Sequence, residues 1–107
     1  MTEERLRGLL SEVKIGLKQI YGSRLRGLYL CGSYARKEQD DESDVDVLIV
    51  LDDIRLYGAE IERTGELASR LSLEYGATVS RVFVSEQDWR ALDNPFLGGV
   101  REEAVPA

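Results

Sequence analysis

The sequence contains no histidine and only one cysteine, Cys31. Zinc sites in proteins are built mainly from these two residue types, and a lone cysteine closes no disulfide within the chain. No apolar run approaches the ~20 residues that a helix needs to cross a bilayer. The first residues are polar and lack the apolar segment of a secretory signal. We therefore expect a cytoplasmic protein without zinc chemistry and without a membrane partner.

The chain also lacks the basic excess that is typical of proteins bound to nucleic acid. Its formal net charge is −6, whereas such proteins carry clustered lysine and arginine, so nucleic acid is not an expected partner. A hydrophobic content of 43% in 107 residues favours a folded globule. No repeat, low-complexity tract or linker divides the chain, and we expect one domain over residues 1–107.

The strongest chemical signal lies in a predicted strand–turn–strand unit. Apolar residues from Leu25 to Cys31 predict a buried strand. Gly32 ends this strand, because a residue without Cβ accepts unusual dihedral angles and lets a ligand approach the backbone. Ser33 is the expected N-cap of a short helix from Tyr34 to Lys37, and the first N–H groups of such a helix can bind a phosphate.

The second strand of the unit, predicted from Asp44 to Leu51, begins with two carboxylates. Residues i and i+2 of a strand share a face, so Asp44 and Asp46 point the same way while the apolar remainder enters the core. Neighbouring carboxylates repel each other unless one is protonated or a cation bridges them. They could simply be surface carboxylates, but aspartate is depleted in strands, and we predict that the pair binds Mg²⁺.

The acidic residues before this pair raise the alternative of a calcium loop. An EF-hand loop that began at Asp40 would place Val45 where the turn glycine belongs. It would also place Leu51 where the bidentate glutamate belongs. The calcium alternative is therefore rejected, and the acidic loop is expected to be solvated.

Amphipathic patterns predict long helices before and after the unit. The first helix follows Thr2 as its N-cap and ends at Gly22. Its expected apolar face is Leu6, Leu9, Leu10, Val13, Leu17 and Ile20. The second helix spans about Ile54 to Tyr75, with Asp53 as its cap and Gly76 at its end. The charged side chains expected mostly outside this helix are Glu60, Glu62, Arg63 and Arg70.

The remaining residues predict a third strand and two shorter helices. The third strand spans Thr78 to Val84. Ser85 is expected to cap a short helix that holds Trp89, and a further helix is predicted from Pro95 to Glu103. The tail from Ala104 onward is expected to be frayed.

The unit resembles the signature of a known family. The residues Gly32-Ser33, ten intervening positions and Asp44-Val45-Asp46 are similar to the motif of minimal nucleotidyltransferases, within the DNA polymerase β-like superfamily. The wider pattern from Gly32 to Arg36 and from Ser43 to Leu48 matches as well, and the order of elements agrees along nearly the whole chain. The resemblance implies an α/β fold, with a small mixed β-sheet flanked by α-helices.

The resemblance also implies two groups of site residues. The nucleotide-binding group is Gly32, Ser33, Arg36 and Lys37, although many family members have glycine where Lys37 stands. The catalytic and metal-binding pair is Asp44 and Asp46, which would hold Mg²⁺ beside the phosphates of ATP. An acceptor hydroxyl would then attack the α-phosphorus, and pyrophosphate would leave.

One position departs from the family pattern. Active members usually carry a third carboxylate on the following strand, where it completes a two-metal site or acts as a base. Alignment places Ser80 at that position, and the predicted third strand contains no aspartate or glutamate. Glu74 and Glu86 lie just outside its ends.

Two functions follow from this combination. Minimal nucleotidyltransferases commonly pair with a small helical HEPN protein in toxin–antitoxin modules, where they can adenylylate the toxin. The resemblance therefore implies an antitoxin that transfers AMP from ATP to a hydroxyl on a HEPN-type partner. The alternative is a weak or inactive nucleotide-binding module that docks on such a partner, because the third carboxylate is replaced by Ser80. The sequence leaves self-association open.

Overall fold

The computed structural model of the chain describes residues 1–40, 44–91 and 103–107. Its elements, in chain order, are α1 (Glu3–Tyr21), a short 3₁₀ helix (Gly22–Arg24), β1 (Leu25–Cys31), α2 (Gly32–Arg36), β2 (Val45–Leu51), α3 (Tyr57–Tyr75), β3 (Val79–Ser85), α4 (Glu86–Arg90) and β4 (Val105–Pro106). Within the described residues, none of the helices is both long and apolar enough to span a membrane.

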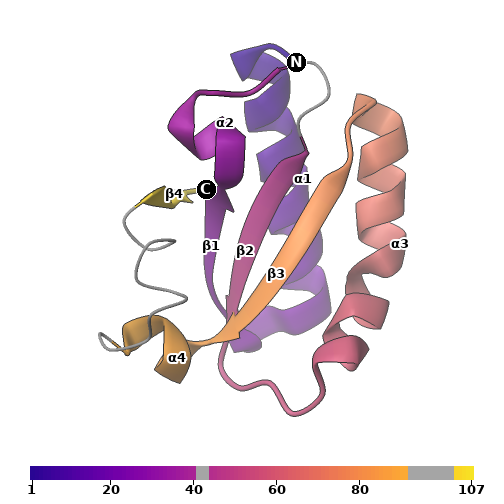
Figure 1. Cartoon of the computed structure of the whole chain (residues 1–107). Coiled ribbons are helices and arrows are strands. Elements are labelled where there is room, and N and C mark those ends of the chain that lie inside the picture. The colour runs from indigo at the N-terminus through magenta and orange to yellow at the C-terminus, as the bar shows by residue number, and fades with distance from the viewer. Residues whose placement is uncertain (41–43, 92–102) are drawn as a thin grey trace.

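The strands form one mixed sheet in the order β3-β2-β1-β4. The pairs β1–β2 and β1–β4 are antiparallel, whereas β2–β3 is parallel. A parallel pair needs a long crossover connection, and α3 provides it. Figure 1 shows α1 lying behind the sheet and α3 running along the side of β3. The predicted α/β fold, a small mixed sheet with flanking helices, is confirmed.

The core lies mainly between the sheet and these two long helices. Side chains of β2 that face the helices are fully buried: Val45, Val47, Ile49 and Leu51. The opposite face of the sheet holds a smaller apolar cluster around Leu48, Val50 and Val84. Trp89 of α4 stacks against Tyr29 at the edge of this cluster, with ring centroids 4.7 Å apart. Burial on both faces explains why β2 is a continuous apolar run.

The predicted ends of α1 are confirmed. The Thr2 hydroxyl accepts a hydrogen bond from the Arg5 N–H at 3.1 Å, and Gly22 follows the helix with a φ of 56°. The expected apolar face needs one correction, because Ile20 is 39% exposed whereas Tyr21 is buried. The last turn of α1 thus faces the core through its tyrosine, whose hydroxyl bonds to a buried carboxylate of α3.

The helix α3 begins later than predicted. Its N-cap is Leu56, without a capping side chain, and Asp53 does not cap it. The reason lies in the preceding loop, where Asp52 Oδ1 accepts hydrogen bonds from the Asp53 N–H and from the Arg24 guanidinium. These bonds hold the chain in a loop up to the helix. Gly76 ends α3 in the left-handed conformation, with a φ of 65°, as predicted.

The chain end is paired, so the prediction of a frayed tail is wrong. Strand β4 pairs with the outer edge of β1, and the Ala107 N–H donates to the Leu28 carbonyl at 3.0 Å. An edge strand leaves backbone groups without hydrogen-bond partners. The tail supplies such partners to β1. The capping role of Ser85 is confirmed, since its hydroxyl accepts a hydrogen bond from Asp88 N–H. Most of the helix predicted from Pro95 lies outside the described residues.

Candidate nucleotide and metal site

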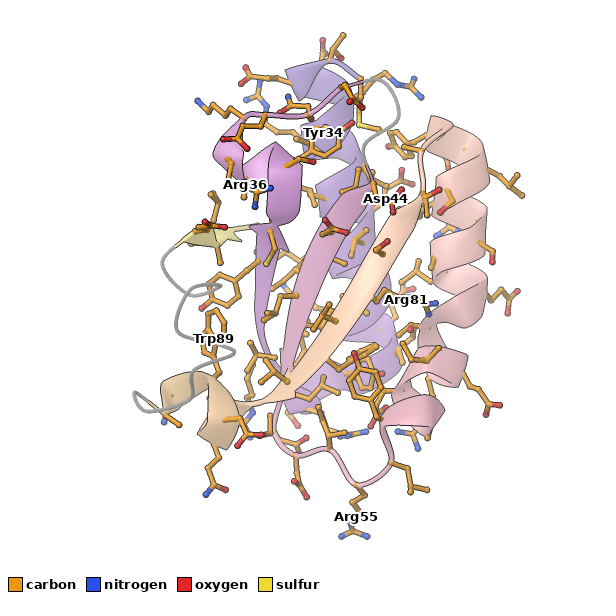
Figure 2. The ribbon with its side chains drawn as sticks, in the orientation of Figure 1. Tyr34, Arg36, Asp44, Arg55, Arg81 and Trp89 are labelled. Atoms are coloured by element: carbon orange, nitrogen blue, oxygen red, sulfur yellow. The ribbon has the colours of Figure 1, made fainter. Side chains whose placement is uncertain are left out.

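The candidate site lies where β1 ends and β2 and β3 begin. Asp44 immediately precedes β2 and is exposed, whereas Asp46 is its second residue and is half-buried. In the sheet, Asp46 pairs with Cys31 on one side and with Ser80 on the other. Figure 2 shows Asp44 at the same end of the sheet as Tyr34 and Arg36 of α2. The structure therefore brings together both halves of the predicted motif.

Gly32 allows the Asp46 carboxylate to lie directly against the turn. A Cβ atom at Gly32 would overlap Oδ2 of Asp46, and the backbone at Gly32 has a φ of 68°. Residues other than glycine rarely adopt this left-handed backbone conformation. Glycine is therefore required twice at this position, once for the turn and once for the close approach of the carboxylate.

The short helix α2 begins two residues earlier than an N-cap at Ser33 would place it. Its N-cap is Cys31, no side chain caps it, and Ser33 lies within its first turn. The positive φ of Gly32 starts the turn there, so the predicted capping role of Ser33 is wrong. Lys37 follows α2 in the left-handed conformation, with a φ of 58°. Glycine adopts this conformation most easily, which accounts for the family preference at this position.

Tyr34 packs in the main core and is only 6% exposed. The thiol of Cys31 has an inert character. Burial raises the pKa of its thiol to about 11, and the nearby Asp46 and Glu103 carboxylates contribute to this increase. Because the thiolate is the nucleophilic form, Cys31 is no candidate nucleophile.

The aspartate pair is electrostatically strained. Burial raises the pKa of Asp46, the neighbouring Asp44 carboxylate raises it as well, and Arg36 lowers it. A cation between the two carboxylates would stabilise their ionised forms and so offset both causes of the raised pKa. Carboxylate oxygens are the ligands that Mg²⁺ prefers, so the residues present fit a magnesium ion. Among residues 1–40, 44–91 and 103–107, no group of three or more histidine, cysteine, aspartate or glutamate side chains could hold a metal ion.

Ser80 lies on β3, beside the aspartate pair. It is in register with Asp46, and its hydroxyl lies 3.4 Å from Oδ2 of Asp44, to which it donates. The two glutamates near the ends of β3 are engaged elsewhere. Glu74 pairs with Arg70 at 3.5 Å, and Glu86 pairs with two arginines, at 3.3 and 3.7 Å.

The basic residues of the motif lie on the outer side of α2. Arg36 is held between two carboxylates, Glu38 at 3.1 Å and Glu103 at 3.2 Å. Lys37 is exposed. A phosphate group that approached Arg36 would therefore compete with Glu38 and Glu103 for its guanidinium.

A second polar cluster, at the other end of the sheet, was not predicted. Glu60, which was expected outside α3, is 2% exposed and accepts hydrogen bonds from Tyr21, Arg24 and Arg63. An open hollow of about 410 Å³ adjoins this cluster and reaches Arg55. Figure 2 shows Arg55 and Asp44 at opposite ends of the molecule.

A signal for the burial of Glu60 is present in the sequence. Tyr57, Glu60, Thr64, Ala68 and Leu71 follow one another at helical spacings of three and four residues, which place them on one face. Four of the five are buried in the structure, Glu60 among them. Its position on the apolar stripe would have predicted a buried, paired carboxylate.

Comparisons with known proteins agree with this geometry. A family model described as "Nucleotidyltransferase domain" matches residues 10–88. Two curated proteins of Methanocaldococcus jannaschii are similar. "Putative protein adenylyltransferase MJ0604" is 33% identical over 87 residues, which cover 81% of this chain and 78% of that protein. "Putative protein adenylyltransferase MJ0141" is 36% identical over 74 residues, which cover 69% of this chain and 74% of that protein.

Solved structures are similar as well. "Structure of putative minimal nucleotidyltransferase" is 26% identical, with a TM-score of 0.62, and the match covers 100% of this chain and 97% of that chain. "Crystal structure of the toxin-antitoxin with AMP-PNP" is 25% identical, with a TM-score of 0.54. That match covers 68% of this chain and 55% of the other, so the likeness spans little more than half of the chain from that complex.

Proposed function

Because the chain belongs to the nucleotidyltransferase domain family, we propose that it binds ATP with Mg²⁺ and transfers AMP to a hydroxyl group of a partner protein. One observation carries the proposal: the carboxylate of Asp46, which follows Asp44 at the start of β2, lies directly against Gly32, where α2 begins. A cation and a phosphate would meet at this point. The names of the two archaeal relatives also support adenylyl transfer, since both are described as protein adenylyltransferases.

Each site residue has a separate task in this proposal. Gly32 and Ser33 leave backbone N–H groups open toward the β- and γ-phosphates, since no side chain caps α2. Arg36 and Lys37 supply positive charge on the outer side of the triphosphate. Asp44 and Asp46 hold Mg²⁺, which neutralises charge on the phosphates when it is bound.

The reaction needs no covalent intermediate between AMP and this chain. The acceptor oxygen bonds to the α-phosphorus, and the bond from the α-phosphorus to the bridging oxygen of the β-phosphate breaks. Pyrophosphate leaves with that electron pair, and the hydroxyl proton passes to solvent. The task of the chain is to hold the phosphates and the acceptor in line, which converts a bimolecular encounter into a positioned one.

The proposed acceptor lies on a second chain. Residues 1–107 act as a single nucleotidyltransferase domain in this proposal, and the partner is a small helical protein of the HEPN type. The structural likeness to toxin–antitoxin complexes supports such a pairing, including the complex with AMP-PNP and a mutant of MntA-HpeT. The MntA-HpeT match is 26% identical, with a TM-score of 0.50, over 68% of this chain and 56% of the other.

A second function is favoured by one specific observation. Ser80 is in register with Asp46 and donates to Asp44, where the family resemblance implies a third carboxylate, and a serine hydroxyl is a poor base. The chain would then be a module that binds Mg²⁺ and ATP and docks on its partner without appreciable transfer.

A labelling experiment separates the two functions. The protein, with the proteins that co-purify from its native lysate, is incubated with Mg²⁺ and ATP labelled at the α-phosphate. The variants are Asp44→Asn and Asp46→Asn, and the matched control is Asp53→Asn, which makes the same exchange at an exposed position far from the site.

Transfer is supported if label becomes covalently attached to a partner with the wild type and Asp53→Asn but with neither site variant. ATP binding that depends on Mg²⁺, without any transfer, favours the docking module instead. Absence of both binding and transfer contradicts both proposals and leaves only the shared fold.

A further inference from the structure

Ser80 is the neutral member of the site. It lies on β3 in register with Asp46, and side chains in register on neighbouring strands point to the same face of the sheet. Its hydroxyl donates to Oδ2 of Asp44. Ser80 therefore faces the place where a cation would lie, but it brings no negative charge to it.

The charge at this end of the sheet suits one divalent ion. The two carboxylates, Asp44 and Asp46, carry a charge of −2 together when both are ionised, which one Mg²⁺ neutralises. Arg36 already acts on Asp46 as a nearby positive charge. In the part of the chain that the structure describes, no third acidic side chain joins the pair. Among the described residues, a second divalent ion would therefore find no further carboxylate to hold it beside the one ion that the pair shares with the phosphates.

The hydrogen bond from Ser80 also disfavours a second ion. Paired metal sites hold two ions only about 3.5–4 Å apart, so they need anionic oxygens around both ions. The Ser80 hydroxyl donates a long hydrogen bond of 3.4 Å to Asp44 Oδ2 and so engages one of the lone pairs of this oxygen. The serine thus withholds a charge and also engages one of the carboxylate oxygens.

From these observations we infer that the site binds a single divalent ion beside the nucleotide, and that Ser80 sets this number. The inference rests on the proposed function, because it concerns the metal ion of the same nucleotide site. Aspartate at position 80 would add the missing charge on the correct face. Ser80 is only half-buried, so the slightly larger side chain has room toward solvent.

Calorimetric titration with Mn²⁺ in the presence of AMP-PNP tests the inference. We expect one ion per wild-type chain and two per chain for Ser80→Asp. Ser80→Asn is the matched control, because it has the shape of aspartate without its charge, and it should bind one ion. Electron paramagnetic resonance gives a second readout, since two Mn²⁺ ions at close distance couple magnetically and one ion does not.

The possible outcomes distinguish failure of the inference from failure of the proposed function. Two ions bound to the wild type overturn the inference and leave the proposed function intact. Binding of neither Mn²⁺ nor AMP-PNP overturns both. Two ions bound to Ser80→Asn also contradict the inference, because charge would then not be the cause. If Ser80→Asp fails to fold, the wild-type number still decides.

Transfer activity provides a further consequence. A carboxylate at position 80 could accept the proton of the acceptor hydroxyl, and a positioned base typically contributes about 100-fold or more to a rate. We expect Ser80→Asp to transfer label faster than the wild type by at least about tenfold, and Ser80→Asn to show no gain. Equal rates in all three proteins would show that residue 80 does not limit transfer.

Discussion

The two ends of the sheet carry carboxylates in opposite electrostatic conditions, one half-buried and the other buried. At one end, burial and the Asp44 carboxylate raise the pKa of Asp46. At the other end, burial alone would raise the pKa of Glu60, but hydrogen bonds from Arg24, Tyr21 and Arg63 outweigh it and lower the pKa. Figure 2 shows how far apart these ends are, with Asp44 at one and Arg55 at the other.

The difference separates a structural carboxylate from one that we propose binds a cation. A buried charge is costly unless it is paired and hydrogen-bonded. The chain pairs Glu60 with two of its own arginines, at 2.8 and 3.1 Å. It leaves Asp46 beside a like charge and engages the nearest arginine, Arg36, with Glu38 and Glu103 instead. In our interpretation, Glu60 stabilises the fold, whereas Asp46 is held ready for a cation from solution.

The largest effect is expected from Glu60→Gln. The amide keeps the shape of the side chain but leaves Arg24 and Arg63 without their shared counter-ion. Breaking a buried ion pair costs about 3–5 kcal/mol, and the partial exposure of both arginines reduces this to about 2–3 kcal/mol. For a domain of this size, thermal denaturation should show a decrease in Tm of about 8–20 °C.

Glu66→Gln, at an exposed position on the same helix, is the matched control and should change Tm little. Binding of Mg²⁺ and ATP by folded Glu60→Gln should equal that of the wild type, because the site is at the other end of the sheet. Unchanged stability would show that the Glu60 cluster is not structural.

Gly32→Ala should affect both stability and binding. The positive φ of Gly32 costs a residue with a Cβ about 1–2 kcal/mol, and the new methyl group would push the Asp46 carboxylate away from the turn. Displacement of a metal ligand typically costs about 10- to 100-fold in affinity. Calorimetric titration with Mg²⁺ and AMP-PNP would measure the loss.

The control for this variant is Gly58→Ala. Gly58 lies in α3, its backbone is helical, and a methyl group added to it would have no neighbour within 4 Å among the described residues. Alanine there should stabilise the protein by about 0.5–1 kcal/mol and leave binding unchanged. Equal affinity of Gly32→Ala and the wild type would remove the argument that Gly32 positions Asp46.

These two ends also differ in how well the sequence predicts them. The site end is encoded locally: a strand, a glycine turn and two aspartates at strand spacing lie within 22 residues, from Leu25 to Asp46. Local patterns also predicted the caps Thr2 and Gly76. What a local pattern misassigned there was the cap of α2, because Gly32, with its positive φ, already begins the helix before Ser33.

The other end depends on contacts that are distant in sequence. Glu60 is buried because Tyr21 and Arg24, more than 30 residues earlier, donate to it. The same arginine holds the loop before α3, which is why Asp53 caps nothing. Strand β4 likewise forms through pairing with β1, and a two-residue strand has no periodicity of its own. Such features follow from tertiary pairing rather than from propensity.

Asp46→Asn should change the free energy of unfolding less than Glu60→Gln does, and in the opposite direction. In the absence of divalent ions, the substitution removes a buried charge that lies beside Asp44, so the free energy of unfolding should rise by about 0.5–1 kcal/mol. With Mg²⁺ and ATP at about 100 times the dissociation constant, the wild type should gain about 2.7 kcal/mol and the variant little. Chemical denaturation with and without ligand measures both. Destabilisation of the ligand-free variant would contradict our interpretation of Asp46.

The smallest effect is the pH dependence that distinguishes the two carboxylates. The pKa of Glu60 is lowered on folding from its ordinary value of 4.5, so its contribution to stability is present above that value and is lost as pH falls through the folded pKa. The pKa of Asp46 is raised from 3.8, so its ionisation disfavours folding, and that cost disappears as pH falls below 3.8.

Free energies of unfolding measured without divalent ions from pH 7 to pH 3 would test these signs. The deficit of Glu60→Gln relative to the wild type should shrink toward low pH, and so should the gain of Asp46→Asn. The two difference curves should therefore approach zero from opposite sides. Curves that approach from the same side would mean that both carboxylates have the same role, which the hydrogen bonds to Glu60 and the like charge beside Asp46 argue against.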